Sequence, residues 1–378
     1  PFGQTTANGN DSIRLSLLTC APGEEIYSLF GHTAIRYEDP ANGIDAVFNY
    51  GLFSFNTPNF IFRFSLGETD YQLGATDYAH FAAEYAFDGR SVWQQTLNLS
   101  KEEKAELIRL LQENYRPENR VYRYNFFYDN CATRPRDKIE ESIIGKVIYP
   151  SEPQDGSRSF RDIVHQYCKG HPWARFGIDL CIGSEADRPI TQRQMMFAPF
   201  YLMDAFAGAQ IANDSIQRPL VSDKALIVDA VSDEEEGGWM PTPLQCSLLL
   251  FILTAAATIY SLRKRTGLWG VDLVLFGTAG IVGCVLAFLA LFSEHPAVSS
   301  NFLLLVFHPG QFLFLPYIIY CVRKGKKCWY LTLNLIVLTL FIAFFPLIPQ
   351  RFDFAVVPLA LCLLIRSASN LILTSKKK

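Results

Sequence analysis

Residues 30–35 of the chain read Phe-Gly-His-Thr-Ala-Ile, and residues 124–131 read Tyr-Asn-Phe-Phe-Tyr-Asp-Asn-Cys. The first stretch has a histidine at the head of an apolar run that predicts a strand. The second has a cysteine between an aromatic run and a polar segment, residues 132–144, that predicts a helix. A cysteine beside a helix N-terminus and an imidazole brought next to it are the two halves of an activated thiol. We therefore take His32 and Cys131 as a candidate catalytic pair.

A purely structural role is the alternative for both residues. A buried small cysteine and a hydrogen-bonded core histidine are the commoner case for either residue taken alone. Arg134 and Arg136 follow the cysteine and would add to the positive end of the helix dipole, which favours a thiolate. The sequence has no Gly-x-Ser-x-Gly, no His-Glu-x-x-His and no phosphate-binding glycine loop. A thiol is thus the best candidate nucleophile.

The pattern around the pair predicts a domain of strands and helices. Strands are expected at residues 29–37, 45–51 and 91–99, after a short apolar run at residues 13–18, and the turn at residues 38–43 joins the first two strands as a hairpin. His32 and Asn49 then lie on neighbouring strands. Ser100 and Glu103 form a capping box that opens a helix to about residue 113.

The last third of the chain reads as a membrane domain. Five stretches approach the roughly 20 apolar residues that cross a bilayer as a helix; they are residues 243–262, 268–292, 302–322, 329–348 and 354–373. Basic clusters at residues 263–265, 323–327 and 376–378 follow the first, third and fifth stretches, which places all three in the cytoplasm. Asp272 and Arg366 are expected to reach the cytoplasmic edge. We divide the chain into an exported domain, residues 1–238, and a transmembrane domain, residues 239–378, whose C-terminus is cytoplasmic.

Charge and cysteine content exclude some classes of function. The formal net charge is -3 and no basic stripe is present, so no nucleic-acid partner is expected. Cys168 and Cys181 lie in the exported part, where a disulfide can form between them. Together with His171 they also suggest zinc, but three ligands at irregular spacing are a weak pattern. We expect neither a metal nor a cofactor.

These features together resemble known families. The order histidine, second-strand polar residue, cysteine is similar to the circularly permuted papain-like (NlpC-type) fold of lecithin:retinol acyltransferases and their phospholipase relatives. Nearly the whole chain resembles the Bacteroidales lipoprotein N-acyltransferase (Lnb) family, through residues 28–34, 47–51, 124–137 and 186–189 and a membrane segment that carries His295, Pro296 and Asn301. The resemblance implies an α+β fold: a permuted papain-like exported domain followed by an all-α membrane domain of five transmembrane helices.

The resemblance also implies roles for individual residues. Cys131 would be the nucleophile and His32 the base. Asn49 is our choice for the residue that orients the imidazole, and Asp45 on the same strand is the rival. Asn125 is a candidate oxyanion donor, with a role in a local turn as the alternative.

The implied reaction takes place at a membrane. An acyl chain would pass from a membrane phospholipid, through a thioester on Cys131, to the α-amine of a diacylglyceryl-cysteine lipoprotein. The location would be the bacterial inner membrane, with the N-terminal domain in the periplasm. Polar groups near lipid are candidates for function, so we list possible substrate-entry residues: Arg134, Arg136, Glu294, His295 and Asn301.

Three other functions fit the same features. A membrane-anchored cysteine peptidase or amidase, or a phospholipase, would use the same pair of residues. Five spans argue against a peptidase, for which one anchor suffices. A non-catalytic binding module on a membrane scaffold is the third alternative.

Overall fold

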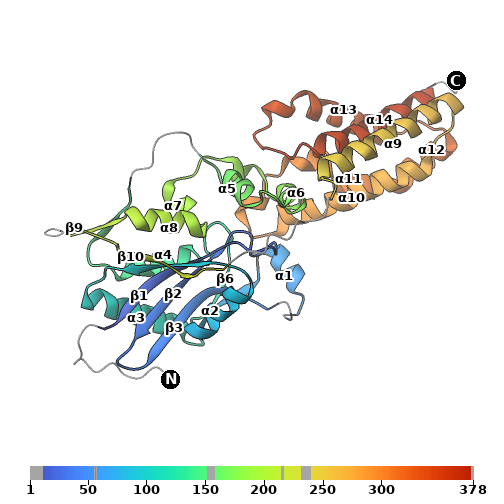
Figure 1. Ribbon diagram of the computed structural model, residues 1–378. Coiled ribbons are helices and arrows are strands. Elements are labelled where there is room, and N and C mark those ends of the chain that lie inside the picture. The colour runs from blue at the N-terminus through green and yellow to red at the C-terminus, as the bar shows by residue number, and fades with distance from the viewer. Residues whose placement is uncertain are drawn as a thin grey trace. The chain divides into compact units, whose positions relative to one another are not determined.

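The computed structural model describes residues 12–54, 56, 58–150, 158–213, 217–230 and 240–375 (Figure 1). The chain divides into two compact units. The first comprises Pro1–Tyr167 and Pro189–Glu236, and the second comprises Cys168–Arg188 and Gly237–Lys378. The predicted domain boundary at residues 238 and 239 and the basic cluster at residues 376–378 lie outside the described residues. The boundary stays a prediction.

An antiparallel sheet is the frame of the first unit. Its seven strands, in the part of the chain that the structure describes, run in the order β10-β5-β1-β2-β3-β4-β6. They are β1 (Arg14–Cys20), β2 (His32–Asp39), β3 (Ile44–Leu52), β4 (Asp70–Asp77), β5 (Val92–Leu97), β6 (Val121–Arg123) and β10 (Val221–Val228). The three predicted strands are confirmed as β2, β3 and β5, and the apolar run at residues 13–18 forms most of β1. A small second sheet joins β7 (Lys146–Ile148), β8 (Gln210–Ala212) and β9 (Gln217–Pro219).

Helices cover both faces of the large sheet. On one face, α3 (Lys101–Tyr115), α4 (Thr133–Ser142) and α8 (Pro199–Gly208) share a core with Leu17. On the other, α2 (Tyr78–Phe87) shares a core with Leu18, the next residue of the same strand. Successive residues of a strand face opposite ways, so burial on both faces explains the unbroken apolar run of β1. Three shorter helices complete the unit: α1 (Phe60–Leu66), α5 (Phe160–Tyr167) and α7 (Gln192–Met195).

The predicted capping box is confirmed. The Ser100 hydroxyl accepts the backbone N–H of Glu103 at 3.2 Å, and the Glu103 carboxylate accepts the backbone N–H of Ser100 at 2.7 Å. Two N–H groups that the helix leaves unpaired at its start are thereby satisfied, which fixes where α3 begins.

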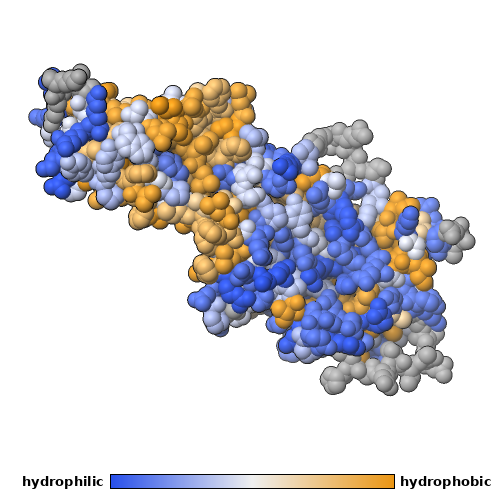
Figure 2. Space-filling view, turned by 180° about the vertical axis from the view of Figure 1, so that it is seen from behind, coloured by the Kyte–Doolittle hydropathy of each residue, from blue (hydrophilic) through white to orange (hydrophobic). Residues whose placement is uncertain are grey.

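The second unit is helical and apolar. Among its described residues, three helices are long and apolar enough to cross a membrane: α9 (Pro243–Lys264), α10 (Trp269–Phe292) and α14 (Val356–Ser375). The bent pair α12 (Leu315–Lys324) and α13 (Trp329–Ala343) gives a fourth crossing if it counts as one span. Apolar residues gather on the surface of this unit, whereas hydrophilic residues dominate the surface of the first (Figure 2). The predicted class, an α+β unit followed by a helical membrane unit, is confirmed.

The third predicted span, residues 302–322, is not a continuous helix. It is divided into the 3₁₀ turn η3 (Phe302–Leu305), α11 (Pro309–Leu313) and α12. Pro309 has no backbone N–H and begins a helix rather than continuing one. On α10, a Cβ added at Gly283 would lie 2.5 Å from the backbone of His308, so the glycine lets the interrupted segment pack against that helix. Irregular backbone at membrane depth requires such protein cover.

Residues 168–188 pack with the helices of the second unit. They form α6 (Pro172–Cys181) and the 3₁₀ turn η1 (Ser184–Asp187). The Asn301 amide donates to the carbonyl of Leu180 at 2.7 Å, and the Arg351 guanidinium donates to Asp187 at 3.0 Å. This accounts for a segment to which the sequence pattern assigns no role.

Asp272 and Arg366 do not reach an aqueous edge, contrary to our expectation. Both side chains are fully buried, and the guanidinium donates to the carboxylate at 2.7 and 3.1 Å. The Asn370 amide donates to the same carboxylate at 3.0 Å. Burial of a charge is costly unless it is paired and hydrogen-bonded. The two partners are 94 residues apart in the sequence, so a local sequence pattern could not predict this pairing.

Replacing Asp272 by alanine should lower the free energy of unfolding by about 3–5 kcal/mol, because Arg366 keeps a buried charge without its partner. The double variant Asp272→Leu with Arg366→Met should recover most of that loss. Thermal unfolding of the purified full-length protein in detergent measures both. Equal melting temperatures for the Asp272→Ala variant and the wild type would contradict the pairing.

Candidate active site

Cys131 lies where the β2–β3 ladder ends. The last paired residues of that ladder are Ala34 and Asn49. Beyond them the backbone N–H of Thr33 hydrogen-bonds the Cys131 sulfur. A Cβ added at Gly51 would lie 3.5 Å from Cys131 Cβ, so the thiol occupies the gap between the two diverging strands. The cysteine remains partly exposed there.

Asn130 fixes the backbone on either side of the cysteine. Its side-chain oxygen accepts the N–H groups of Ala132 and Thr133 at 2.8 and 2.9 Å. Its amide nitrogen donates to the carbonyls of Phe126 and Phe197 at 2.8 and 2.9 Å. The amide therefore caps α4 and holds the preceding loop, and Cys131 lies directly before the helix, as predicted.

His32 is held by Asn49. The His32 Nε2 lies 3.3 Å from the Asn49 side-chain oxygen, across the β2–β3 pair. With the proton on Nε2 this contact is an N–H···O hydrogen bond, and Nδ1 has the free lone pair. Asn49 is 6% exposed, and this burial restricts its rotamer. The structure thus places Asn49 in hydrogen-bond contact with the imidazole; its role in catalysis stays a prediction.

Asp45, the rival of Asn49, does not lie beside His32. It pairs with Glu38 at the opposite end of the β2–β3 ladder. Its carboxylate accepts two hydrogen bonds from the Arg36 guanidinium, at 2.8 and 2.7 Å. The rival assignment, with Asp45 as the orienting residue, is therefore wrong. Asp45 lies four residues before Asn49 on β3, and its carboxylate is paired with Arg36 instead.

Burial opposes the thiolate that we expected beside the helix N-terminus. Burial raises the pKa of the Cys131 thiol to about 11, although the hydrogen bonds from Thr33 and from its own N–H oppose this shift. Burial also lowers the pKa of the His32 imidazole to about 4. Between these values the thiol keeps its proton and the imidazole is uncharged, since burial disfavours either charged form.

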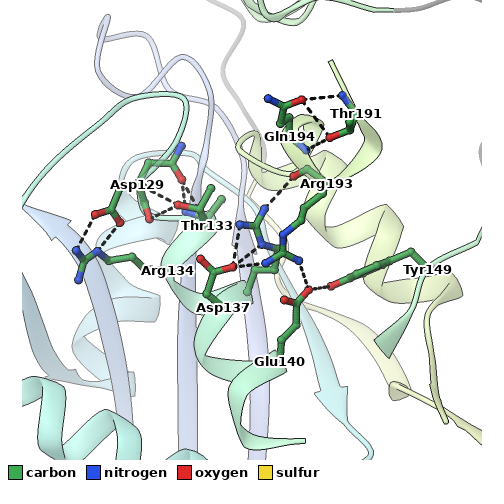
Figure 3. A network of polar contacts seen from close by, with 12 residues as sticks. Asp129, Thr133, Arg134, Asp137, Glu140, Tyr149, Thr191, Arg193 and Gln194 are labelled. Atoms are coloured by element: carbon green, nitrogen blue, oxygen red, sulfur yellow. Dashed lines mark hydrogen bonds and ion pairs between the residues drawn. The ribbon is translucent and has the colours of Figure 1, made fainter. Parts of the chain in front are cut away.

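Arg134 and Arg136 do not present free charge to the thiol. The Arg134 guanidinium donates to both oxygens of Asp129, at 2.6 and 2.7 Å (Figure 3). Arg136 donates to the Asp137 carboxylate at 2.9 Å and to the Arg193 carbonyl at 2.9 Å. These pairs neutralise the field that the sequence suggests, and Arg136 is buried. Their proposed contribution to substrate entry stays untested, and their contacts are those of residues that hold the fold.

The network around Arg193 fixes α4 to α7. Arg193 donates to Asp137 at 2.7 Å and to Glu140 at 2.6 Å, and the Tyr149 hydroxyl donates to Glu140 at 2.5 Å (Figure 3). Arg193 on α7 and Tyr149, which follows β7, thereby hold the helix that begins behind Cys131.

Asn125 takes part in a turn. Its side-chain oxygen accepts the backbone N–H groups of Phe127 and Tyr128 at 3.2 and 3.3 Å, and its backbone pairs with Asp129. These contacts favour the turn alternative for Asn125 over the oxyanion role.

The remaining entry candidates belong to the second unit. Asn301 is 6% exposed, and its side-chain oxygen accepts from Leu303 N–H at 3.0 Å while its amide holds Leu180. Glu294 is exposed and His295 half-buried between α10 and the next 3₁₀ turn. Asn301 thus supports the unit itself, and a role of these residues at the entrance stays a prediction.

Cys168 and Cys181 are free thiols, the first buried and the second partly so. Within the described ranges no three His, Cys, Asp or Glu side chains gather as metal ligands. The disulfide and the zinc site are therefore both without support in this structure.

A chain of aromatic rings, which the sequence analysis missed, leads away from Cys131. The Tyr124 ring lies 3.7 Å from a Cβ added at Gly51, beside the cysteine. Tyr124 stacks on Tyr71 at 4.2 Å, Tyr71 contacts Phe53 at 5.2 Å, and Phe53 stacks on Phe60 of α1 at 5.5 Å, all between ring centroids. Although α1 is rich in apolar residues, it buries none of them. Only the unusual sequence of α1, Phe-Ile-Phe-Arg-Phe-Ser-Leu, hints at this surface.

The neutral pair predicts slow alkylation of Cys131 at neutral pH. Iodoacetamide attacks the thiolate, so with a pKa of about 11 the rate should rise about tenfold per pH unit between pH 7 and 10. Mass spectrometry of the Cys131 peptide measures the alkylation rate. Glutathione in the same tube serves as an ordinary thiol for comparison, and the Cys131→Ser variant gives the background from the other cysteines. A rate that is already at its plateau at pH 7 would show an ion pair instead.

Two family models match the chain. One describes the Lnb N-terminal periplasmic domain and covers residues 4–155; the other describes the Lnb transmembrane domain and covers residues 234–378. No curated protein and no solved structure gives a match. The two matches follow one another in the order that the sequence and the fold require: a periplasmic domain, then a membrane domain. This membrane protein with a periplasmic domain therefore belongs to the Lnb family.

Proposed function

We propose that the chain is a lipoprotein N-acyltransferase of the bacterial inner membrane, with Cys131 as nucleophile, His32 as base and Asn49 as the residue that orients the imidazole. The observation that carries the proposal is the site at the end of the β2–β3 ladder. There the backbone N–H of Thr33, the residue after His32, hydrogen-bonds the Cys131 sulfur, and the Asn49 side-chain oxygen lies 3.3 Å from His32 Nε2. The acyl donor is a phospholipid, and the acceptor is the α-amine of a diacylglyceryl-cysteine lipoprotein.

The first half-reaction acylates the cysteine. His32 Nδ1 takes the thiol proton while the sulfur attacks the ester carbonyl carbon of the phospholipid. The bond between this carbon and the glycerol oxygen then breaks, and the imidazolium returns the proton to that oxygen. The products are a Cys131 thioester and a lysophospholipid. Because burial disfavours both charges, the proton moves during the attack rather than before it.

The second half-reaction transfers the acyl chain. The neutral α-amine of the lipoprotein attacks the thioester carbonyl, and His32 Nδ1 accepts a proton from the nitrogen. The carbon–sulfur bond breaks, the thiolate takes the proton back from the imidazolium, and an amide remains on the lipoprotein. No oxidant, reductant or cofactor enters either half-reaction.

The surface of α1 supports a lipid donor. Ile61, Phe62 and Phe64 on this helix are 80%, 57% and 47% exposed. The Arg63 guanidinium is paired with Asp70 at 2.6 Å, so the helix presents apolar area with its charge neutralised. Exposed apolar patches mark lipid or protein contacts. Since the aromatic rings described above join this patch to Cys131, an acyl chain fits this route better than a polar cell-wall peptide.

A phospholipase is the rival that the same site supports. It differs only in the acceptor of the thioester, which would be water. Exclusion of water from the acyl-enzyme therefore decides between the two activities.

The purified full-length protein in phospholipid micelles should acylate a diacylated lipopeptide, and Cys131→Ser should not. The wild type should yield triacylated lipopeptide, an equal amount of lysophospholipid and an acylated Cys131 peptide, all by mass spectrometry. Asn49→Ala should slow the reaction by less than the roughly 10²–10⁴-fold that a general base contributes, because His32 remains but is no longer oriented. Free fatty acid without triacylated product would identify a phospholipase, and the absence of lipid turnover would contradict both.

Removing the apolar surface of α1 should affect only substrates held in a bilayer. Ile61→Ser with Phe62→Ser should reduce turnover of bilayer phospholipid by about tenfold or more, because each apolar side chain taken out of water contributes about 1.5–3 kcal/mol. Turnover of a monomeric short-chain phospholipid should stay unchanged. Phe87→Ser is the matched control, since Phe87 is 91% exposed but lies on α2 and not on α1. Equal losses on both substrates would show that the surface does not contact lipid.

A further inference from the structure

The Tyr122 hydroxyl is a buried polar group without a partner. Tyr122 is 8% exposed, and in the part of the chain that the structure describes its hydroxyl oxygen has no hydrogen-bond partner. Nearly all buried polar groups of native proteins are paired, and leaving one unpaired costs free energy. A hydroxyl that is kept in this state needs an explanation, such as a ligand that binds only during function.

The hydroxyl borders the space beside the candidate nucleophile. A Cβ added at Gly51 would lie 3.9 Å from the Tyr122 oxygen and 3.5 Å from Cys131 Cβ. The glycine has a φ of +90°, which favours glycine, and its missing side chain leaves room between the two groups. Tyr122 and Cys131 thus face the same gap at the end of the β2–β3 ladder.

The Arg134 guanidinium lies over the ring of Tyr122. Its carbon lies 3.5 Å from the centroid of the ring. Both oxygens of Asp129 hold that guanidinium in place. Burial raises the pKa of Tyr122, so the phenol keeps its proton and remains a hydrogen-bond donor, although Arg134 opposes this shift. This contact also gives Arg134 a task other than substrate entry.

We infer that Tyr122 is a catalytic residue whose hydroxyl donates a hydrogen bond to the oxyanion formed when Cys131 attacks an ester carbonyl. The inference rests on the proposed thiol acyl transfer, and it assigns to Tyr122 the role for which Asn125 was considered. The backbone N–H of Cys131 hydrogen-bonds the sulfur of the same residue, and in this inference it is the second donor to the oxyanion. The partner missing from the resting enzyme is the negative oxygen of the tetrahedral intermediate. A group that is paired only in that intermediate lowers the barrier without tightening substrate binding.

Tyr122→Phe tests this inference in the full-length protein. The rate of Cys131 acylation by p-nitrophenyl butyrate should fall on the order of 10²–10³-fold, as on loss of one oxyanion donor, with KM unchanged. The melting temperature should not fall, because the lost hydroxyl has no partner in the folded protein. With the matching thionoester the loss should shrink, since the sulfur of a C=S group accepts hydrogen bonds weakly.

Tyr50→Phe is the matched control. The Tyr50 hydroxyl donates to the Asn114 side-chain oxygen at 2.8 Å, so its removal should lower the melting temperature and leave the acylation rate unchanged. Two results would overturn the inference. In the first, the Tyr122→Phe variant is acylated at the wild-type rate. In the second, it loses stability and is acylated more slowly by the ester and the thionoester to the same extent.

The soluble ester separates this inference from the proposed function. A wild type that is acylated on Cys131 but never acylates a lipopeptide would refute the proposed acceptor and leave the Tyr122 test intact. A wild type that acylates lipopeptide, with Tyr122→Phe equally fast, would refute Tyr122 alone. If no ester acylates Cys131 in the wild type, both proposals fall.

Discussion

The end of the β2–β3 ladder at Ala34 and Asn49 is the constraint on which the site depends. Strands that stayed paired would leave no gap for a side chain between them. The register of β3 with β4 also shifts between Asn49 and Leu52, where the pairing resumes with Gln72, so both ladders of β3 are irregular at the same point. Gly51, with its positive φ, lies in this irregular stretch. Asn49, still held on both sides, is a rigid support for the imidazole, whereas the residues just beyond it make room for a thiol.

A neutral thiol and a neutral imidazole follow from the same burial. The pKa of Cys131, about 11, and that of His32, about 4, both move away from neutrality because the site desolvates either charged form. The thiolate is the form that oxidants and disulfides attack. A thiol that keeps its proton is therefore protected in the periplasm, where disulfides form. In the proposed reaction such a thiol is a weaker resting nucleophile, which makes stabilisation of the oxyanion more important.

The sequence predicts the parts of this site that depend on local pattern. The strands that carry His32 and Asn49, the helix behind Cys131 and the capping box at Ser100 are all signalled by residues within a few positions of each other. The choice between Asn49 and Asp45 required the register, because both lie on the same strand.

Contacts between distant segments explain what the sequence could not predict. Arg136 meets a carbonyl 57 residues away, and Arg366 meets a carboxylate 94 residues away. The third apolar stretch has the hydropathy of a span, but its packing against Gly283 allows a broken path instead. Tyr122 is one of several tyrosines in its region, and only the structure shows that its hydroxyl faces the gap at Gly51 unpaired.

Polar contacts also decide where the chain can be divided. Hydropathy suggests that the exported part ends where α9 begins. Yet the segment 168–188 has its partners in the helical unit, where Asn301, Gln350 and Arg351 hold its backbone and Asp187. A cut before α9 would take this segment away from those partners and leave their buried amides unpaired, at a cost of about 1–3 kcal/mol each. The segment 168–188 therefore belongs to the helical unit, although it precedes α9 in the sequence.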